Sequence, residues 1–142
     1  MFRILKKSLL TGIVTSNYPK EPDPAPEGFR GRPEVDFEKC TGCKVCSEAC
    51  PSEAITYEDD LKQGIRNWQL SYAHCIFCGA CEEQCPYGAI TLSRFYEMAS
   101  RNKDDLFVMA KFQLSSCPHC GQYFETIREI QRTSKEVSHG CG

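Results

Sequence analysis

Two copies of one cysteine motif constrain this chain of 142 residues more than any other feature. Each copy has the spacing C-x2-C-x2-C-x3-C-P, and the copies comprise Cys40, Cys43, Cys46, Cys50 and Pro51, then Cys75, Cys78, Cys81, Cys85 and Pro86. Aligning residues 40–57 with residues 75–92, an offset of 35, gives nine identities in 18 positions. The centre of the chain is therefore an internal duplication.

The spacing predicts iron–sulfur clusters in preference to zinc or disulfides. Three thiolates at intervals of three residues wrap one set of corners of a cubane, whereas zinc sites use separated C-x-x-C pairs. The fourth cysteine lies about one helical turn beyond the third, so a short helix carries it to the other cluster. This predicts two [4Fe-4S] clusters with crossed ligands. The first would be held by Cys40, Cys43, Cys46 and Cys85, and the second by Cys75, Cys78, Cys81 and Cys50.

A thin hydrophobic core supports the same interpretation. Hydrophobic residues make up 41% of the chain, but 11 residues in that count are cysteines. Without them the fraction falls to about a third, which is low for a globular domain. Because crossed ligands tie the two halves together, bound metal would replace part of the missing core. We therefore expect the chain without metal to be poorly folded.

Hydrophobic alternation around the motifs predicts a strand, a ligand loop with a short helix, and a second strand, twice over. The expected strands lie near residues 35–37, 54–57, 68–72 and 89–92, and residues 58–64 supply the turn between the middle two. The predicted fold class is α+β, with a bacterial-type two-cluster ferredoxin core that has a pseudo-twofold axis.

The segments on both sides of this core differ from it in composition. Residues 1–33 combine an expected amphipathic helix, from Phe2 to Val14, with a proline-rich extended arm. Their six Lys/Arg and three Asp/Glu give a net charge of +3, which leaves −5 on the other 109 residues. A helical C-terminal extension is expected, with helices over 93–101 and 123–132 and a capped segment after Asp104. The predicted domains are a docking arm (1–33), a ferredoxin domain (34–93) and this extension (94–142).

Composition and missing motifs narrow the function. A net charge of −2 excludes a generic polyanion binder, so no nucleic-acid partner is expected. No apolar run approaches the ~18 residues of a membrane span, and none resembles a cleaved signal, so we expect a cytoplasmic chain. The sequence has no Gly-rich phosphate loop, no H-E-x-x-H motif and no nucleophile with a base, which predicts a chain that is not itself an enzyme.

A second, smaller cysteine motif lies near the C-terminus. Cys117-Pro118-His119-Cys120-Gly121 has the form of a zinc knuckle, but a closed tetrahedral site needs two more ligands. Downstream, His139 and Cys141 could supply them at an unusual spacing. Structural zinc and free or disulfide-prone thiols stay open as alternatives.

Three other residues near the motifs could have functional roles, but the sequence predicts none for them. His74 precedes Cys75 and is interpreted as a loop histidine bonded to backbone. Trp68 and Phe77 could shield a cluster from water, but aromatic residues in such positions are interpreted as packing.

Further motifs resemble a known family. The arm contains Thr15-Ser16-Asn17-Tyr18-Pro19, Glu21-Pro22 and Phe29-Arg30-Gly31-Arg32-Pro33, and the second loop reads His74-Cys75-Ile76-Phe77-Cys78-Gly79-x-Cys81-Glu82-Glu83-x-Cys85-Pro86. These residues resemble the complex I 23-kDa-type ferredoxin subunits. Within that superfamily they are most similar to the iron–sulfur subunits of formate hydrogenlyase and related membrane-bound [NiFe] hydrogenases. The resemblance covers about residues 1–112.

The resemblance implies an electron-transfer subunit that relays electrons through two [4Fe-4S] clusters toward a hydrogenase small subunit. The implied partners are the hydrogenase small and large subunits, a membrane-arm subunit and an upstream electron-donor subunit. The implied location is peripheral, on the cytoplasmic side of a prokaryotic cell membrane. Two alternatives stay open, namely the same subunit in a quinone-reducing complex I and a free soluble ferredoxin. The arm argues against the second, because a diffusing carrier gains nothing from a docking helix and strap.

Overall fold

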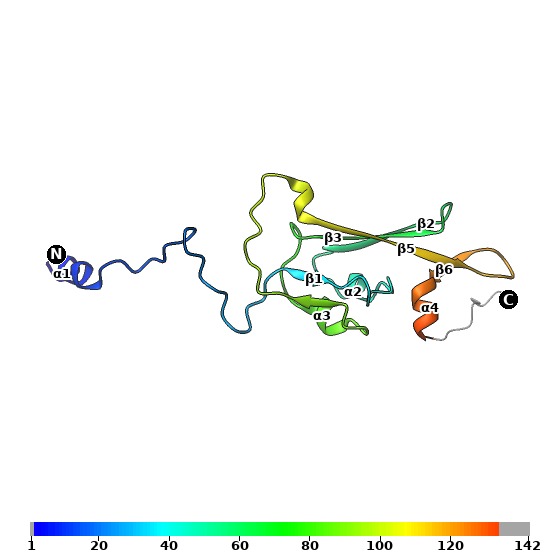
Figure 1. The fold of residues 1–142 in the computed structure, drawn as a ribbon, viewed down its shortest axis with the longest axis horizontal. Coiled ribbons are helices and arrows are strands. Elements are labelled where there is room, and N and C mark those ends of the chain that lie inside the picture. Colours follow the sequence, from blue (N-terminus) through cyan, green and yellow to red (C-terminus); the bar gives the residue numbers. More distant parts are fainter. Residues whose placement is uncertain (1, 134–142) are drawn as a thin grey trace.

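The computed structural model describes residues 2–133. Its elements, in chain order, are α1 (Phe2–Thr11), β1 (Pro33–Val35), α2 (Val45–Glu48), β2 (Ile55–Asp60), β3 (Ile65–Ser71), α3 (Ala80–Gln84), β4 (Ile90–Leu92), the 3-10 helix η1 (Lys103–Leu106), β5 (Phe107–Ser116), β6 (Tyr123–Thr126) and α4 (Ile127–Thr133). The strands and short helices form one body, from which an N-terminal arm extends (Figure 1).

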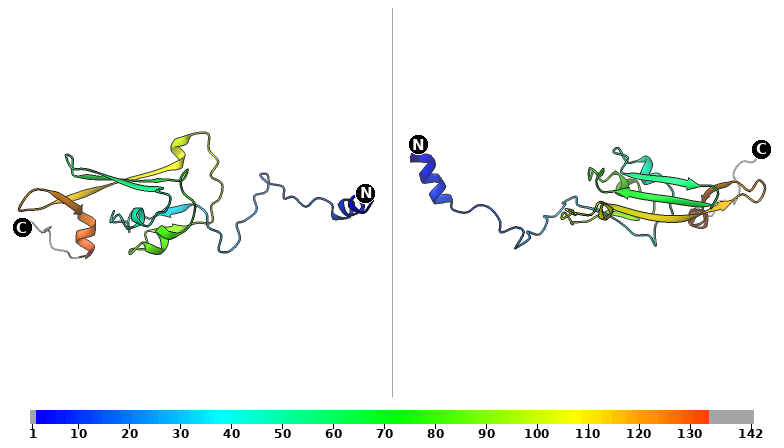
Figure 2. Two further views of the ribbon diagram at one scale, coloured as in Figure 1. Left: turned by 180° about the vertical axis from the view of Figure 1, so that it is seen from behind. Right: turned by 90° about the horizontal axis from the view of Figure 1, so that it is seen from above.

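The helix α1 lies at the far end of this arm, away from the sheets (Figure 2). None of its residues is buried. The predicted N-terminal helix is confirmed as far as Thr11, three residues short of its expected end. Gly12 follows with a positive φ of 64°, the left-handed conformation that commonly ends a helix.

Two antiparallel strand pairs form the duplicated core. β1 pairs with β4, and β2 pairs with β3. The register is the same in both pairs, because Val35 lies opposite Ile90 in one, and Leu70 opposite Ile55 in the other. Each of these residues is 35 positions from its counterpart in the repeat. The sequence duplication is therefore also structural, which confirms the predicted two-cluster ferredoxin core.

The C-terminal extension differs from the expectation. Residues 93–101 contain no helix, and residues 107–126 form a β hairpin in place of helix. β5 pairs along the whole of β3, giving a four-stranded sheet in the order β2-β3-β5-β6. The helical prediction was wrong here because Phe112 and Leu114 are buried while Lys111 and Gln113 are exposed, a period of two that indicates a strand. α4, at Ile127–Thr133, overlaps the C-terminal part of the helix expected over 123–132.

The hydrophobic core lies between the two sheets and contains cysteines of both motifs. Its buried members are Cys46, Ala54, Ile55, Trp68, Leu70, Tyr72, Cys81, Ile90 and Phe112. Residues that would carry metal are thus part of the core itself. This agrees with the thin apolar composition, since a bound cluster contributes packing as well as ligands.

Candidate metal centres

Two small hollows of equal size flank the core, each with a cavity volume of about 20 Å³. The cysteines that line the first are Cys40, Cys43, Cys46 and Cys85. Those that line the second are Cys50, Cys75, Cys78 and Cys81. Each hollow combines three cysteines of one motif with the fourth of the other. This arrangement supports our proposal of crossed ligands, with the first cluster in the first hollow and the second cluster in the second.

The cysteine arrangement suits a multi-iron group better than a single ion. Within residues 2–133, no three His, Cys, Asp or Glu side chains converge closely enough to hold one metal ion. The eight motif cysteines are not joined in disulfides. In a [4Fe-4S] cluster each thiolate binds a separate iron at a corner, so the sulfurs surround a volume and do not meet at a point.

Backbone conformation in the two ligand loops follows the repeat. Left-handed φ angles occur at three equivalent pairs of positions, and each pair has glycine in one half only: Gly42 and Phe77, Lys44 and Gly79, Glu53 and Gly88. A non-glycine residue in this conformation costs of order 1 kcal/mol or more, so the surrounding structure must impose it. The loops therefore require these turns at the same places, whatever residue is present.

Backbone amides in these loops already point at sulfur. The amide of Ala54 donates to Cys50 Sγ at 3.3 Å, and the equivalent amide of Ala89 donates to Cys85 Sγ at 3.3 Å. Such N–H···S hydrogen bonds stabilise negative charge on thiolate sulfur. The hollows thus fit an anionic, thiolate-held group.

Burial makes the innermost thiols hard to ionise. It raises the pKa of Cys46 to about 12 and that of Cys81 to about 11. Burial acts in the same direction on Cys50, but hydrogen bonds from the backbone of Ile55 and from Ser52 outweigh it and lower the pKa. Metal binding must therefore displace protons from the buried thiols, so assembly depends on the metal–sulfur bonds.

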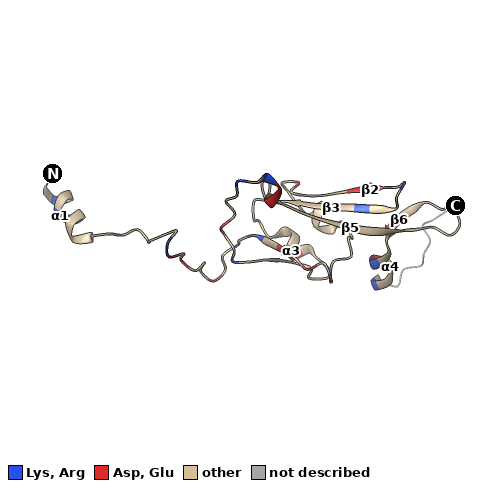
Figure 3. Ribbon diagram, turned by 45° about the horizontal axis from the view of Figure 1, so that its top comes forward, with Lys and Arg blue, Asp and Glu red and all other residues tan. Residues whose placement is uncertain are grey.

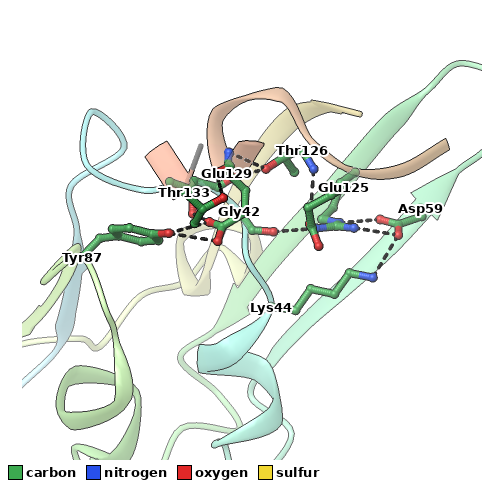
Figure 4. Close-up of polar contacts among 10 residues, drawn as sticks. Gly42, Lys44, Asp59, Tyr87, Glu125, Thr126, Glu129 and Thr133 are labelled. Atoms are coloured by element: carbon green, nitrogen blue, oxygen red, sulfur yellow. Dashed lines mark hydrogen bonds and ion pairs between the residues drawn. The ribbon is translucent and has the colours of Figure 1, made fainter. Parts of the chain in front are cut away.

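A buried ion-pair network fixes the first ligand loop to the sheet. The guanidinium of Arg66 on β3 is completely buried and donates to the Gly42 carbonyl at 2.7 Å (Figure 4). It also bonds both carboxylate oxygens of Asp59, at 2.7 and 3.1 Å, and Glu125 at 2.7 Å. Burial alone would raise the pKa of Asp59, but Arg66, followed by Lys44, holds that pKa below its usual range.

A second set of contacts joins the same loop to the C-terminal extension. Glu129 on α4 accepts hydrogen bonds from the hydroxyls of Thr41, at 2.7 Å, and Tyr87, at 2.9 Å (Figure 4). Burial, and then the Glu129 carboxylate, raise the pKa of Tyr87 to about 12, so this phenol remains a donor. The Thr126 hydroxyl donates to the Thr41 carbonyl. The backbone of Gly42 also packs closely against the ring of Phe112, because a Cβ atom added to Gly42 would lie 2.8 Å from that ring.

The β5–β6 hairpin and α4 therefore cover the first ligand loop. Thr41 is 1% exposed, whereas Ile76, its equivalent in the second loop, is 61% exposed. The second loop is instead contacted by Arg30 of the arm, which donates to the Cys78 carbonyl at 3.0 Å, and is bordered by Phe95 and Met98. The cysteines are predicted from the sequence, whereas the roles of Arg66 and Glu129 and this asymmetry are not.

Cys117, Cys120 and His74 line neither hollow, whereas Trp68 lines the first and Phe77 lines the second. Cys117 and Cys120 are in the turn between β5 and β6, where Cys117 is buried and Cys120 is exposed. His139 and Cys141, the other candidate zinc ligands, are outside the described residues. His74 is exposed.

Comparison with known proteins decides the family. Residues 39–89 match the family described as the 4Fe-4S dicluster domain. Over 139 residues, the chain is 45% identical to formate hydrogenlyase subunit 6 of Escherichia coli (strain K12), covering 98% of this chain and 77% of that protein. The chain belongs to the formate hydrogenlyase subunit 6 family. As a member with a dicluster domain, it holds two [4Fe-4S] clusters.

A solved structure agrees with this subunit 6 fold. The chain resembles a chain in the structure of the membrane-bound sulfane sulfur reductase (MBS), an archaeal respiratory membrane complex, with a TM-score of 0.55. The identity is 23%, and the match covers 94% of this chain and 66% of that chain. No helix within residues 2–133 is long and apolar enough to cross a bilayer.

Proposed function

We propose that this chain is the electron-transfer subunit of a membrane-bound, multi-subunit [NiFe] hydrogenase of the formate hydrogenlyase type. It would relay electrons through two [4Fe-4S] clusters toward the hydrogenase small subunit and would not itself be catalytic. The observation that carries the proposal is the pair of equivalent cysteine-lined hollows on one shared core, in a chain 45% identical to formate hydrogenlyase subunit 6.

The chemistry required of the protein is limited. A bound [4Fe-4S] cluster supplies one-electron transfer without making or breaking bonds to a substrate. The chain's residues donate N–H groups to sulfur and fix the first ligand loop to the sheet. Cys46 and Cys81, one from each hollow, belong to the same core cluster, so the two centres are close neighbours. This proximity suits an internal relay.

The N-terminal arm supports permanent docking in a complex. The apolar side chains of α1 are exposed, with Phe2 at 87%, Leu9 at 77% and Leu5 at 57%, and Arg3, Lys6 and Lys7 add positive charge. Figure 3 shows the blue of Lys and Arg on this helix. An exposed apolar face of this kind marks an interaction surface. We propose that it docks on a membrane-arm subunit or the adjacent membrane surface, on the cytoplasmic side. The hydrogenase small and large subunits and an electron-donor subunit complete the proposed set of partners.

Deleting residues 2–16 is expected to separate docking from cluster assembly. The truncated chain should keep both clusters, because none of the deleted residues lines a cysteine hollow. It should no longer sediment with membranes or co-purify with its complex, which fractionation and immunoblotting would show. Co-purification of the truncated chain in a stoichiometric amount would refute docking through α1.

Purification of the native complex under anaerobic conditions tests the function as a whole. The complex is expected to evolve hydrogen from a low-potential donor such as formate or reduced ferredoxin. Metal analysis of its separated subunits should find nickel in a partner and not in this chain. A nickel-free complex that reduces quinone would instead assign the chain to the complex I branch.

A further inference from the structure

The indole of Trp68 is buried with an unused hydrogen-bond donor. Among residues 2–133, three buried side-chain nitrogen or oxygen atoms have no hydrogen-bond partner, and one is Trp68 Nε1. The side chain of Trp68 is 2% exposed. Leaving a buried donor unpaired costs about 1–3 kcal/mol, so such a group requires an explanation. Packing accounts for the rings of Trp68 but not for its N–H.

The ring that carries this N–H borders the first hollow. Trp68 lines that hollow with the cysteines. The other two unpaired atoms, Arg32 Nε and Ser71 Oγ, belong to residues that line neither hollow. The ring of Trp68 is held in an edge-to-face contact with Phe37, with centroids 6.1 Å apart. A fixed ring therefore holds this donor beside the cysteines of the first hollow.

The second hollow has no counterpart to this donor. The residue 35 positions before Trp68 is Pro33, which lines the second hollow. Proline has neither a side-chain donor nor a backbone N–H. At this position of the repeat, the first hollow therefore has a side-chain donor and the second has none.

We propose that the indole N–H of Trp68 donates a hydrogen bond to a sulfur atom of the first cluster or its Cys46 ligand, and so raises the midpoint potential of that cluster. The proposal rests on the two-cluster relay and adds to it a residue that sets the potential of one centre. Reduction adds negative charge, and an N–H group directed at sulfur stabilises that charge. The second cluster receives no such contribution from Pro33.

Isotope labelling of tryptophan tests the contact directly, because the chain contains a single tryptophan. Full-length holoprotein carrying indole-15N tryptophan is prepared without oxygen, reduced, and examined by electron–nuclear resonance. We expect a hyperfine coupling to the label and to its exchangeable proton. The coupling should disappear in Cys43→Ala, which removes a ligand of the first cluster, and persist in Cys78→Ala. Absence of the coupling, or its persistence in Cys43→Ala, would overturn the proposal.

Redox titration tests the consequence. In Trp68→Phe the midpoint potential of the first cluster should fall while that of the second stays unchanged. Phe112→Leu changes packing in the same core without removing a donor, so it should cause no comparable fall. An unchanged potential, or equal shifts at both clusters, would count against the role of Trp68. If Trp68→Phe does not assemble, the labelled wild-type protein still decides.

These readouts are independent of the partners. If the native complex contains no hydrogenase, the proposed function is refuted. A hyperfine coupling to the indole would still support the role of Trp68. If the complex evolves hydrogen but the indole shows no hyperfine coupling, the proposed function is supported and the role of Trp68 is refuted.

Discussion

Paired cysteine substitutions are expected to destroy either one cluster or both, depending on which motifs they combine. Wild-type protein prepared without oxygen should contain about eight iron and eight sulfide per chain. Cys50→Ala combined with Cys78→Ala removes two ligands from one cluster under crossed ligation, so about four iron should remain in one intact cluster. Cys50→Ala combined with Cys43→Ala damages both clusters, and no intact four-iron cluster should remain.

The two double variants are matched, because each removes two cysteines and one of them is Cys50 in both. If every motif instead held its own cluster, the outcomes would be exchanged, and the Cys50/Cys43 pair would retain the intact cluster. Iron analysis combined with electron paramagnetic resonance distinguishes intact clusters from three-iron remnants. An intact cluster in the Cys50/Cys43 variant would therefore contradict the proposed ligand set.

The ferredoxin core was predictable because its signals are local or repeated. The cysteine spacing, the proline after each fourth cysteine and the short alternating segments all act within a few residues. The duplication then fixed the strand pairing, since Val35 with Ile90 and Leu70 with Ile55 follow the same register. The left-handed positions were also within reach, because Gly42, Gly79 and Gly88 each mark one member of an equivalent pair.

The contacts around the first loop were not predictable in the same way. Arg66 meets Glu125 across 59 residues, and Thr41 meets Glu129 across 88, so no short window contains the signal. Glu125 lies on β6 and Glu129 on α4, which follows β6 directly. Their positions beside the first loop cannot be predicted unless the β5–β6 hairpin is predicted first. The mistaken helical prediction for that segment therefore also concealed the network. One sequence sign was present, since polar Thr41 replaces the apolar Ile76 of the other copy.

Loss of the buried guanidinium is expected to be the largest stability effect outside the cysteines. Arg66→Ala leaves the Gly42 carbonyl, Asp59 and Glu125 without their shared donor. Removing one partner of a buried ion pair costs about 3–5 kcal/mol, which corresponds to a fall of roughly 10 °C in the thermal midpoint of a chain of this size. Calorimetry of the holoprotein at a fixed scan rate, with loss of visible cluster absorption followed in parallel, measures the shift.

Two further variants separate the causes. Arg66→Lys keeps the charge but loses the planar fork that bonds both oxygens of Asp59, so its midpoint should lie between those of wild type and Arg66→Ala. Arg101→Ala removes an exposed arginine and should change stability by no more than about 0.5 kcal/mol. Because Arg66 holds Gly42, two residues from Cys40, cluster absorption should be lost at the first cluster before the second. Simultaneous loss of both clusters, or a midpoint for Arg66→Ala equal to that of Arg101→Ala, would show that the network does not anchor the loop.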